Sequence, residues 1–590
     1  MGLLFFRITF IFIFAGLIPA IGTIGYSIFK KDYVSAIINT VVNGILILAA
    51  YLIIFMLVPN QYFVSIVTYN LVSLIISLSV NIVLFNIQNN NFDSKDISLT
   101  SVIFALVLLI IFGLFISFIR LGSTKSSANT VETKVSQQVS KAPMPVISSK
   151  NKEVAVANSV KTVKAQIQNS LSNVPNSNVY DVDHLRVQTY RGKMVYVAPL
   201  DFDGSYFRYR HYKKVDGYFI VDATSKNAKP RFVKREMRYT PSAYFGHDAY
   251  RRIYSEVAGS SYSMDENTPQ LEIDDNGKPY YISTLYKRIG ISNRPNFQDK
   301  KVAVLDAEND NVKIYSLKDK PEWLDIAVDP TISSWQIKAW GQERNGWWNA
   351  YGIGGSREGV IKSVNKAGTE GTDQQLTPVL FNKHIYYFAS MTSTNSKQTS
   401  VLGYMYVNAA NGKTYYYREK NDAMTPERAS SLAENRMKQT QWKSSMPLLY
   451  MIDGKPTWIV SMLDDNGAFM SYVYLLASGN GTQSTVAVGN DAKSTLVKYR
   501  SLFGSSTAIP TGKGKTTNIE GKVYRLNISG SKVSFILNGD PRIYTLSLKE
   551  FPEGQFIQSE DNVRFKANIY QKSGDVKSEF ENKTLIEGNK

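Results

Sequence analysis

The densest group of side chains that could do chemistry lies between residues 205 and 238, which hold ten Lys or Arg against three Asp or Glu. Read as a strand, residues 205–214 alternate aromatic and basic side chains, and alternate positions share a face. A basic, aromatic face suits a polyanion: nucleic acid inside the cell, or teichoic acid or lipid headgroups outside it. A solvated hairpin explains the same pattern equally well. The candidate polyanion-binding residues are Arg208, Arg210, Lys213 and Lys214.

Catalytic and metal-binding residues are scarce. The chain has no Cys and only four His, which excludes thiol nucleophiles, Cys-ligated zinc and iron–sulfur clusters. The acidic pairs Asp201/Asp203 and Asp274/Asp275 fall in expected turns, and turn chemistry explains them better than metal binding or acid–base catalysis. We therefore predict no catalytic set, no metal and no cofactor, and a protein that is not an enzyme.

One segment resembles the end of a phosphate-binding loop. Gly512-Lys513-Gly514-Lys515-Thr516 fits the last part of the pattern G-x-x-x-x-G-K-[ST], but the first Gly of that pattern would stand where the chain has Ile509. No apolar strand precedes the segment and no helical pattern follows it. We interpret residues 501–516 as a basic linker.

Aromatic residues gather in a connector over residues 321–369. Five of the seven Trp lie within 26 residues, and they are Trp323, Trp335, Trp340, Trp347 and Trp348. Such a cluster can stack on sugars or bases, or it can form a local core between neighbouring units. We favour the local core.

The elements that position these residues begin with a membrane region. Residues 1–121 hold five Lys or Arg and three Asp or Glu, whereas the remaining 469 residues hold 62 and 46. Because about 20 apolar residues cross a bilayer, we expect four spans near 5–29, 34–58, 62–87 and 98–121. The first span could instead be a signal peptide. Apart from Arg120 at the end of the fourth, no charged residue lies inside spans two to four, which favours a packed anchor over a transporter, and Asn70, Ser73, Ser77 and Asn81 are expected to hydrogen-bond between helices.

A low-aromatic, Ser- and Thr-rich segment, residues 122–151, is expected to be a flexible linker. Beyond it, a turn followed by an alternating strand recurs. The copies begin at Gly192-Lys193, Gly277-Lys278, Asn382-Lys383 and Gly454-Lys455. A strand that runs into an Asp or Asn turn follows three of them, at Asp222, Asp306 and Asn408. These phrases predict four units of helix and antiparallel hairpin over residues 152–240, 241–320, 370–420 and 421–500.

These phrases resemble the PepSY domain family, on Gly277-Lys278-Pro279-Tyr280-Tyr281, Val304-Leu305-Asp306-Ala307 and Gly454-Lys455-Pro456-Thr457-Trp458. The closing Gly of the family's Asp-Ala turn is absent. The resemblance implies an extracytoplasmic binding or inhibitory module and carries no catalytic residues. Residues 517–570 alternate as short strands between turns and resemble a small OB-type barrel, and residues 571–590 are expected to be a disordered tail.

Together these features predict a multidomain chain with four transmembrane helices, then α+β repeats with antiparallel β-hairpins, then a small C-terminal β-barrel. The function we predict is that of a membrane-anchored, non-enzymatic binding or regulatory protein whose β-rich part lies outside the cytoplasm. Its expected partners are membrane lipid and an anionic polymer or envelope protein. Two alternatives remain: a membrane-tethered cytosolic nucleic-acid-binding or scaffold protein, supported by the net charge of +16 over residues 122–590, and an envelope hydrolase.

Overall fold

A computed structural model of the 590-residue chain describes residues 10–587 apart from 89–94, 148–157, 173, 183, 205, 226–227, 265–268, 352–355, 365–375, 396–399, 479–484, 504–514 and 570–572. The chain forms two compact units. The first comprises residues 1–146, 155–470 and 477–480, and the second comprises residues 147–154, 471–476 and 481–590.

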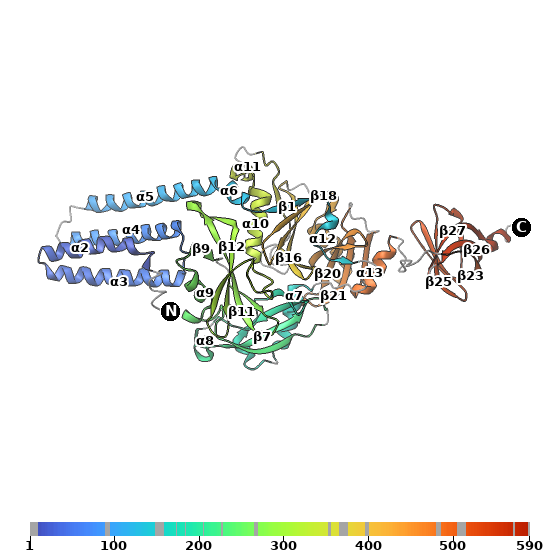
Figure 1. The fold of residues 1–590 in the computed structure, drawn as a ribbon, viewed down its shortest axis with the longest axis horizontal. Helices are drawn as coiled ribbons and strands as arrows, with labels where there is room; N and C mark the ends of the chain where they lie inside the picture. Colours follow the sequence, from blue (N-terminus) through green and yellow to red (C-terminus); the bar gives the residue numbers. More distant parts are fainter. Residues whose placement is uncertain are drawn as a thin grey trace. The chain divides into compact units, whose positions relative to one another are not determined.

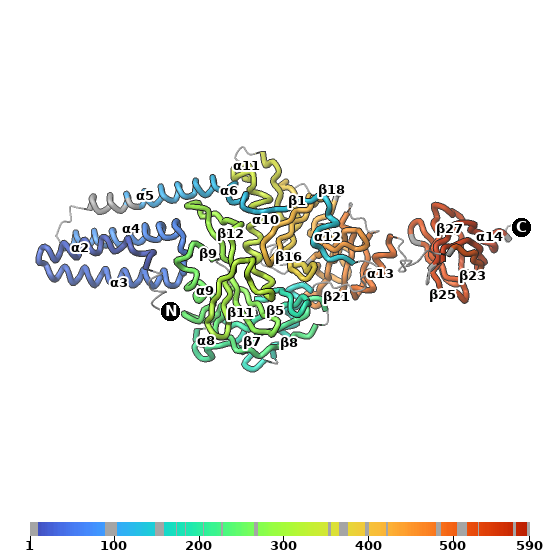
Figure 2. Tube along the Cα trace, viewed as in Figure 1, coloured from blue at the N-terminus to red at the C-terminus, as the bar shows by residue number. Residues whose placement is uncertain are grey.

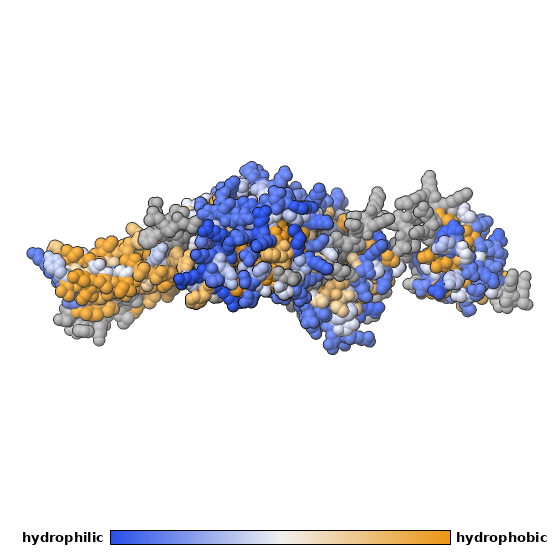
Figure 3. Space-filling view, turned by 90° about the horizontal axis from the view of Figure 1, so that it is seen from below, coloured by the Kyte–Doolittle hydropathy of each residue, from blue (hydrophilic) through white to orange (hydrophobic). Residues whose placement is uncertain are grey.

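Four apolar helices open the first unit. They are α2 (Leu17–Phe29), which follows the short helix η1 (Phe14–Gly16), α3 (Tyr33–Leu57), α4 (Phe63–Gln88) and α5 (Lys95–Gly122). Figure 1 shows α2, α3 and α4 running side by side, and Figure 3 shows them covered with apolar side chains. Among the described residues, α3 and α4 are long and apolar enough to cross a membrane, whereas Phe14–Phe29 and Leu106–Gly122 are shorter apolar helices. Helices lie in the four regions predicted as spans, and two of them have the length and composition of a span, so four membrane spans are not confirmed.

Of the predicted polar residues, Asn70, Ser73 and Asn81 bond to other elements, whereas Ser77 bonds to Asn81 within α4. Asn43 and Asn81 donate to each other's side-chain oxygens at 2.9 and 2.8 Å. Asn70 accepts a hydrogen bond from the backbone N–H of Ala15 at 2.8 Å, and Ser73 accepts one from Gly16 at 3.2 Å. Amide and hydroxyl groups in apolar helices bind each other because no water is present to satisfy them.

The segment expected to be a flexible linker carries regular structure. It contains α6 (Thr124–Asn129), β1 (Thr133–Ser136) and β2 (Val146–Ile147). Strand β1 pairs in parallel with β18 (Thr414–Met424), and Figure 2 shows the two segments side by side. Ala128 and Val131 are buried in a cluster with Tyr286 and Val328. The low aromatic content misled the prediction, because this segment folds on apolar surface that distant strands supply.

Along the first compact unit, the chain forms groups of a helix and the antiparallel strands that follow it. The first has α7 (Val160–Leu171) and the sheet β4 (Arg186–Tyr190), β5 (Lys193–Pro199), β7 (Val215–Asp222) and β8 (Arg231–Met237), beside the small pair β3 (Tyr180–Asp181) and β6 (Asp201–Phe202). The second has α9 (Ala249–Val257), β9 (Tyr262–Met264), β10 (Gln270–Ile273), β11 (Pro279–Ile289), β12 (Arg294–Asp306) and β13 (Val312–Ser316).

The third unit follows α10 (Pro330–Lys338) and α11 (Trp347–Tyr351). Its strands are β14 (Ile361–Ser363), β15 (Thr377–Phe381), β16 (His384–Ser393), β17 (Ser400–Asn408) and β18. The helix α12 (Pro426–Arg436) then leads into the antiparallel hairpin β19 (Lys443–Ile452) and β20 (Lys455–Leu463). Strand β21 (Phe469–Leu476), of which residues 471–476 belong to the second compact unit, pairs antiparallel with β22 (Val486–Gly489), before α13 (Ala492–Ser501).

The recurring phrases are turns, as predicted. Arg191-Gly192, Asn382-Lys383 and Asp453-Gly454 each have positive φ at two successive residues, which matches the right-handed twist of a hairpin. The Asp and Asn turns also share one geometry. Asp222, Asp306 and Asn408 each accept, through the side-chain oxygen, a hydrogen bond from the backbone N–H two residues later, at 2.8–3.0 Å.

The Trp-rich connector packs against these sheets, as favoured. Trp323 stacks on Tyr280 with ring centroids 4.7 Å apart, and Trp335 meets Tyr286 edge-on at 5.8 Å. Trp348 is different, because 59% of its surface is exposed.

A closed five-stranded barrel forms most of the second compact unit. Its strands are β23 (Lys515–Ser529), β24 (Lys532–Leu537), β25 (Asp540–Ser547), β26 (Asn562–Ile569) and β27 (Ser573–Asn582), and α14 (Lys583–Glu587) follows them. The order around the barrel is β23-β24-β25-β27-β26, with β25 and β27 parallel and the other pairs antiparallel. The predicted barrel is confirmed, but the expected disordered tail is wrong, because β27 closes the barrel and buries Val576 and Phe580.

Candidate active site

A cavity of about 530 Å³ lies in the first compact unit, between the turn that joins α3 to α4 and the start of α9. Its wall combines aromatic, polar and charged side chains. They include Asn60, Tyr62, Tyr69, Asp248, Tyr250 and Arg251. A large cavity with a few convergent polar groups is the usual form of a ligand site.

The turn on one side of the cavity is shaped by local sequence. Val58 ends α3 in the left-handed conformation (φ 46°), and Pro59 prevents the helix from continuing. The buried Asn60 side chain then donates to the backbone oxygen of Met264 at 3.3 Å and accepts from its N–H at 3.1 Å. The hydroxyl of Tyr254 donates to the Pro59 oxygen at 2.7 Å. Three hydrogen bonds thus fix the turn against α9 and β9.

Arg251 binds the end of α3 directly. Its guanidinium donates to the backbone oxygens of Phe55 at 2.6 Å and Met56 at 3.2 Å, and it lies 4.7 Å from the centroid of the Phe55 ring. The last carbonyls of a helix have no partner within the helix and carry partial negative charge, so a cation stabilises them. Burial lowers the pKa of Arg251, while the charge of Asp248 raises it.

Asp248 is the ionisable carboxyl group on the cavity wall. It caps α9, since its Oδ1 accepts a hydrogen bond from the Arg251 backbone N–H at 2.8 Å. Burial raises the pKa of Asp248 to about 6, although the Arg251 N–H and the Arg251 charge lower it. A carboxyl group with this pKa can both hold and release a proton near neutral pH, which is what acid–base catalysis requires.

A second carboxyl group, that of Asp201, acts on Asp248 through its charge. Asp201 is buried on β6 and accepts hydrogen bonds from the Ser242 hydroxyl and, at 3.3 Å, from the Ser242 backbone N–H. Burial raises the pKa of Asp201, and its charge in turn raises the pKa of Asp248. The turn interpretation of Asp201 from the sequence is therefore wrong. Asp274 does have the expected turn role, because it accepts from the N–H groups of Asn276 and Lys278.

The predicted polyanion residues lie elsewhere and on a different element. Residues 205–214 were expected to form a strand, but Tyr206–Tyr212 is the helix α8. Tyr209 is buried edge-on against Phe202 with ring centroids 6.0 Å apart, and such contacts override the alternating pattern. In a helix, Arg208 and Arg210 do not share a face.

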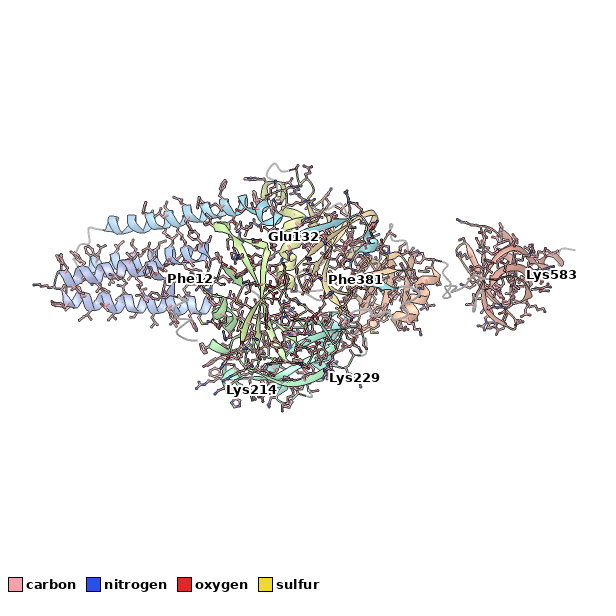
Figure 4. The ribbon with its side chains drawn as sticks, in the orientation of Figure 1. Phe12, Glu132, Lys214, Lys229, Phe381 and Lys583 are labelled. Carbon is pink, nitrogen blue, oxygen red and sulfur yellow. The ribbon has the colours of Figure 1, made fainter. Side chains whose placement is uncertain are left out.

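Two of the four predicted cations have acidic partners. Arg208 contacts Asp203 at 2.6 Å, and Lys214, labelled at the periphery in Figure 4, contacts Glu236 at 2.7 Å. Arg210 and Lys213 are exposed. Polyanion binding by this group stays a prediction. The phosphate-loop-like segment lies largely outside the described residues, and the described part of the chain contains no group of three or more His, Asp or Glu that could hold a metal.

Comparison with known proteins finds solved structures of low similarity only. No family model matches the chain, and no curated protein matches it. An exo-β-1,3-galactanase from Clostridium thermocellum aligns with 68% of this chain and 68% of its own, at 12% identity and a TM-score of 0.20. The arabinanase Arb43A of Bacillus subtilis covers 49% and 70%, at 14% identity and a TM-score of 0.13. The C-terminal domain of Bacillus megaterium YpeB covers 44% and 100%, at 15% identity and a TM-score of 0.12.

The prediction of a non-enzymatic binding protein is wrong against these matches, in which glycoside hydrolases predominate. The envelope hydrolase, the second alternative from the sequence, agrees with them better. The TM-scores of these matches are 0.20 and below, far under those of chains that share a fold.

Proposed function

We propose that this chain is a membrane-anchored hydrolase of the cell envelope, with Asp248 as its proton donor. The observation that carries the proposal is the position of the Asp248 carboxyl group, with its pKa of about 6, on the wall of the 530 Å³ cavity. Strongly shifted pKa values in clefts are characteristic of catalytic groups.

The chemistry follows from the side chains around that carboxyl group. Protonated Asp248 donates its proton to the leaving oxygen as its bond to carbon breaks, and the resulting carboxylate is stabilised by the Arg251 N–H and the nearby Arg251 charge. Water adds to that carbon, and the proton that the water loses restores protonated Asp248. Tyr62 and Tyr69 provide aromatic rings and hydroxyl groups on the same wall. Such a wall suits a substrate rich in hydroxyl groups, and a glycan is the substrate class we propose.

Membrane placement is part of the proposal. The length and composition of α3 and α4 support their role as spans, and the cavity lies at the turn that joins them. We place the β-rich part outside the cytoplasm, where envelope glycans are found. We also retain the PepSY-like and OB-like descriptions as proposals. The helix-and-hairpin units support the first, and the five-stranded barrel with its parallel pair β25–β27 supports the second.

The experiment is a hydrolysis assay with the full-length protein in membranes against β-1,3-galactan, arabinan and β-1,2-mannan. We compare the wild type with Asp248→Asn, which keeps the helix cap because Asn caps as well as Asp. Asp491→Asn is the matched control, since Asp491 caps α13 by the same bond, from the Ser494 N–H, and does not line the cavity. The proposal predicts that the wild type and the control release sugars and that Asp248→Asn does not. Equal release by all three, or no release from any glycan, would contradict it.

A further inference from the structure

A second, smaller cavity of about 190 Å³ lies in the first compact unit, at the C-terminal end of α5. Four cationic side chains and one carboxylate line it, and they are Arg120, Arg288, Arg294, Lys338 and Glu343. The wall therefore carries an excess of positive charge, which favours an anionic ligand.

The only carboxylate on this wall, within the described residues, is already neutralised. Glu343 is buried, pairs with Arg294 at 3.2 Å and accepts the Tyr351 hydroxyl at 3.2 Å. Arg294 also donates to the Arg120 backbone oxygen at 3.0 Å and to the Thr124 hydroxyl at 2.8 Å. The Arg294–Glu343 pair is thus a structural link between α5, α6 and the π-helical turn η7 (Ala339–Glu343).

The other three cationic side chains, Arg120, Arg288 and Lys338, give the cavity wall its excess of positive charge. Arg288 is held in place by the Ser263 hydroxyl at 2.8 Å and the Asn293 backbone oxygen at 3.2 Å, and it lies 4.1 Å from the centroid of the Tyr62 ring. Arg120 and Lys338 are exposed, and in the part of the chain that the structure describes neither forms an ion pair. Arginine and lysine side chains grouped in this way are a typical receptor for phosphate oxygens.

The cavity also lies where a bilayer surface would be. Arg120 stands in the last turn of α5, directly after the apolar stretch of that helix, and Arg288 contacts Tyr62 in the turn that joins α3 to α4. A basic residue at the end of an apolar helix, such as Arg120, is characteristic of the headgroup region.

We infer that this cavity binds the phosphate of an anionic phospholipid headgroup. The inference rests on the membrane placement made above and is independent of catalysis by Asp248, which lies in the other cavity. A basic pocket beside the ends of membrane helices is a known form of lipid headgroup site. Binding would fix the end of α5 to the membrane surface through Arg120.

The test uses the purified full-length protein in detergent, titrated with short-chain phosphatidylglycerol or phosphatidylcholine and followed by native mass spectrometry. We compare the wild type with Arg120→Gln/Lys338→Gln, since substitutions of exposed side chains rarely disturb folding. Lys313→Gln/Lys318→Gln is the control, because it removes the same charge from exposed positions that do not line the cavity. Each cation near a phosphate contributes about fivefold, so we expect the double variant to bind phosphatidylglycerol about 25-fold more weakly.

The expected result is selective binding of phosphatidylglycerol by the wild type and the control, and its loss in the cavity variant. Equal binding of the two lipids, or unchanged binding by the cavity variant, would overturn the inference. A separate titration with inorganic phosphate distinguishes the source of the phosphate: if phosphate alone displaces the lipid at equal concentration, the site takes a free anion and the lipid assignment is wrong. The glycan assay of Asp248→Asn tests the proposed function on its own, so a failure of the lipid inference is distinguished from a failure of the proposed function.

Discussion

Single residues here have two roles at once. Asp248 caps α9 and lines a cavity, and Arg251 binds the end of α3 while its backbone N–H donates to Asp248. The Asn60 side chain bonds both the N–H and the carbonyl oxygen of Met264, as a neighbouring strand would. These residues join the apolar helix α3 to the unit that contains α9 and β9 through hydrogen bonds to backbone atoms, and these bonds hold the cavity wall in place.

Asp248 makes stability depend on pH. Its folded-state pKa of about 6 lies above the value of about 3.9 for an unfolded chain. The stability that this group contributes is therefore fully present below pH 3.9 and is lost as the pH rises through about 6. Asp248→Asn cannot ionise, so we expect its melting temperature, relative to that of the wild type, to be higher at pH 8 than at pH 4.5. The difference is measured by thermal unfolding at both pH values, and an equal difference at the two would show that burial does not shift this carboxyl group.

Local elements explain how the sheets are built. The hairpin turns need left-handed backbone at specific residues, and the sequence places Gly, Asn or Asp at most of them. The helices begin at capping residues, such as Thr425 before α12 and Asp329 before α10, each accepting a backbone N–H three residues later. The elements are thus specified by short-range chemistry, whereas the cavities form where elements distant in sequence meet.

One turn provides a direct test of this view. Gly454 has φ of 77° and open space where a Cβ atom would lie, so Gly454→Ala should cost only the backbone strain of about 1 kcal/mol. Gly217→Ala should cost several-fold more, because its Cβ would lie 2.1 Å from the Val233 backbone oxygen. Chemical unfolding of both variants gives the comparison. Equal losses of stability in the two variants would show that the close approach of the Val233 oxygen to Gly217 does not limit the residue at that position.

The contact between α9 and the α3–α4 turn can be tested by one hydroxyl group. Tyr254→Phe removes the 2.7 Å hydrogen bond to the Pro59 oxygen and should destabilise the turn by about 1 kcal/mol. We expect faster amide hydrogen exchange at residues 60–65 and a lower melting temperature. Tyr524→Phe, on an exposed barrel residue, is the control and should change neither. Unchanged exchange in Tyr254→Phe would mean that α9 does not hold the turn.

For the whole molecule, the sequence predicts what depends on local pattern. The apolar helices, the repeated turns and the C-terminal barrel follow from hydrophobic runs, Gly and Asp positions, and alternation. Helix α8 was missed because the contact of Tyr209 with Phe202 overrides the alternating sequence pattern. Strand β27 was missed because it depends on pairing with β25 and β26 and not on a local pattern of its own. The candidate site could not be predicted, because Asn60 and Asp248 come from distant parts of the chain and neither belongs to a motif.

The segment between the helices and the sheets belongs to the fold. A chain of residues 123–590 keeps α6 and β1, with Ala128 and Val131 in their buried cluster, whereas a chain of residues 150–590 lacks them. Loss of this apolar contact exposes Tyr286 and Phe297. We therefore expect the longer chain to be monomeric with the higher melting temperature and the shorter one to aggregate, as measured by size-exclusion chromatography and thermal unfolding. Identical behaviour of the two would show that α6 and β1 contribute nothing to stability.

The central claim is that Asp248 donates a proton in hydrolysis, and the most direct measurement is the rate of sugar release at pH 5.5 and pH 7.5. With a pKa of about 6, Asp248 is mostly protonated at the lower pH and mostly ionised at the higher one, so the wild type should be faster at pH 5.5 by about tenfold or more. Asp491→Asn should behave as the wild type, and Asp248→Asn should be slow at both pH values. A wild-type rate equal at the two pH values, or full activity in Asp248→Asn, would contradict the account.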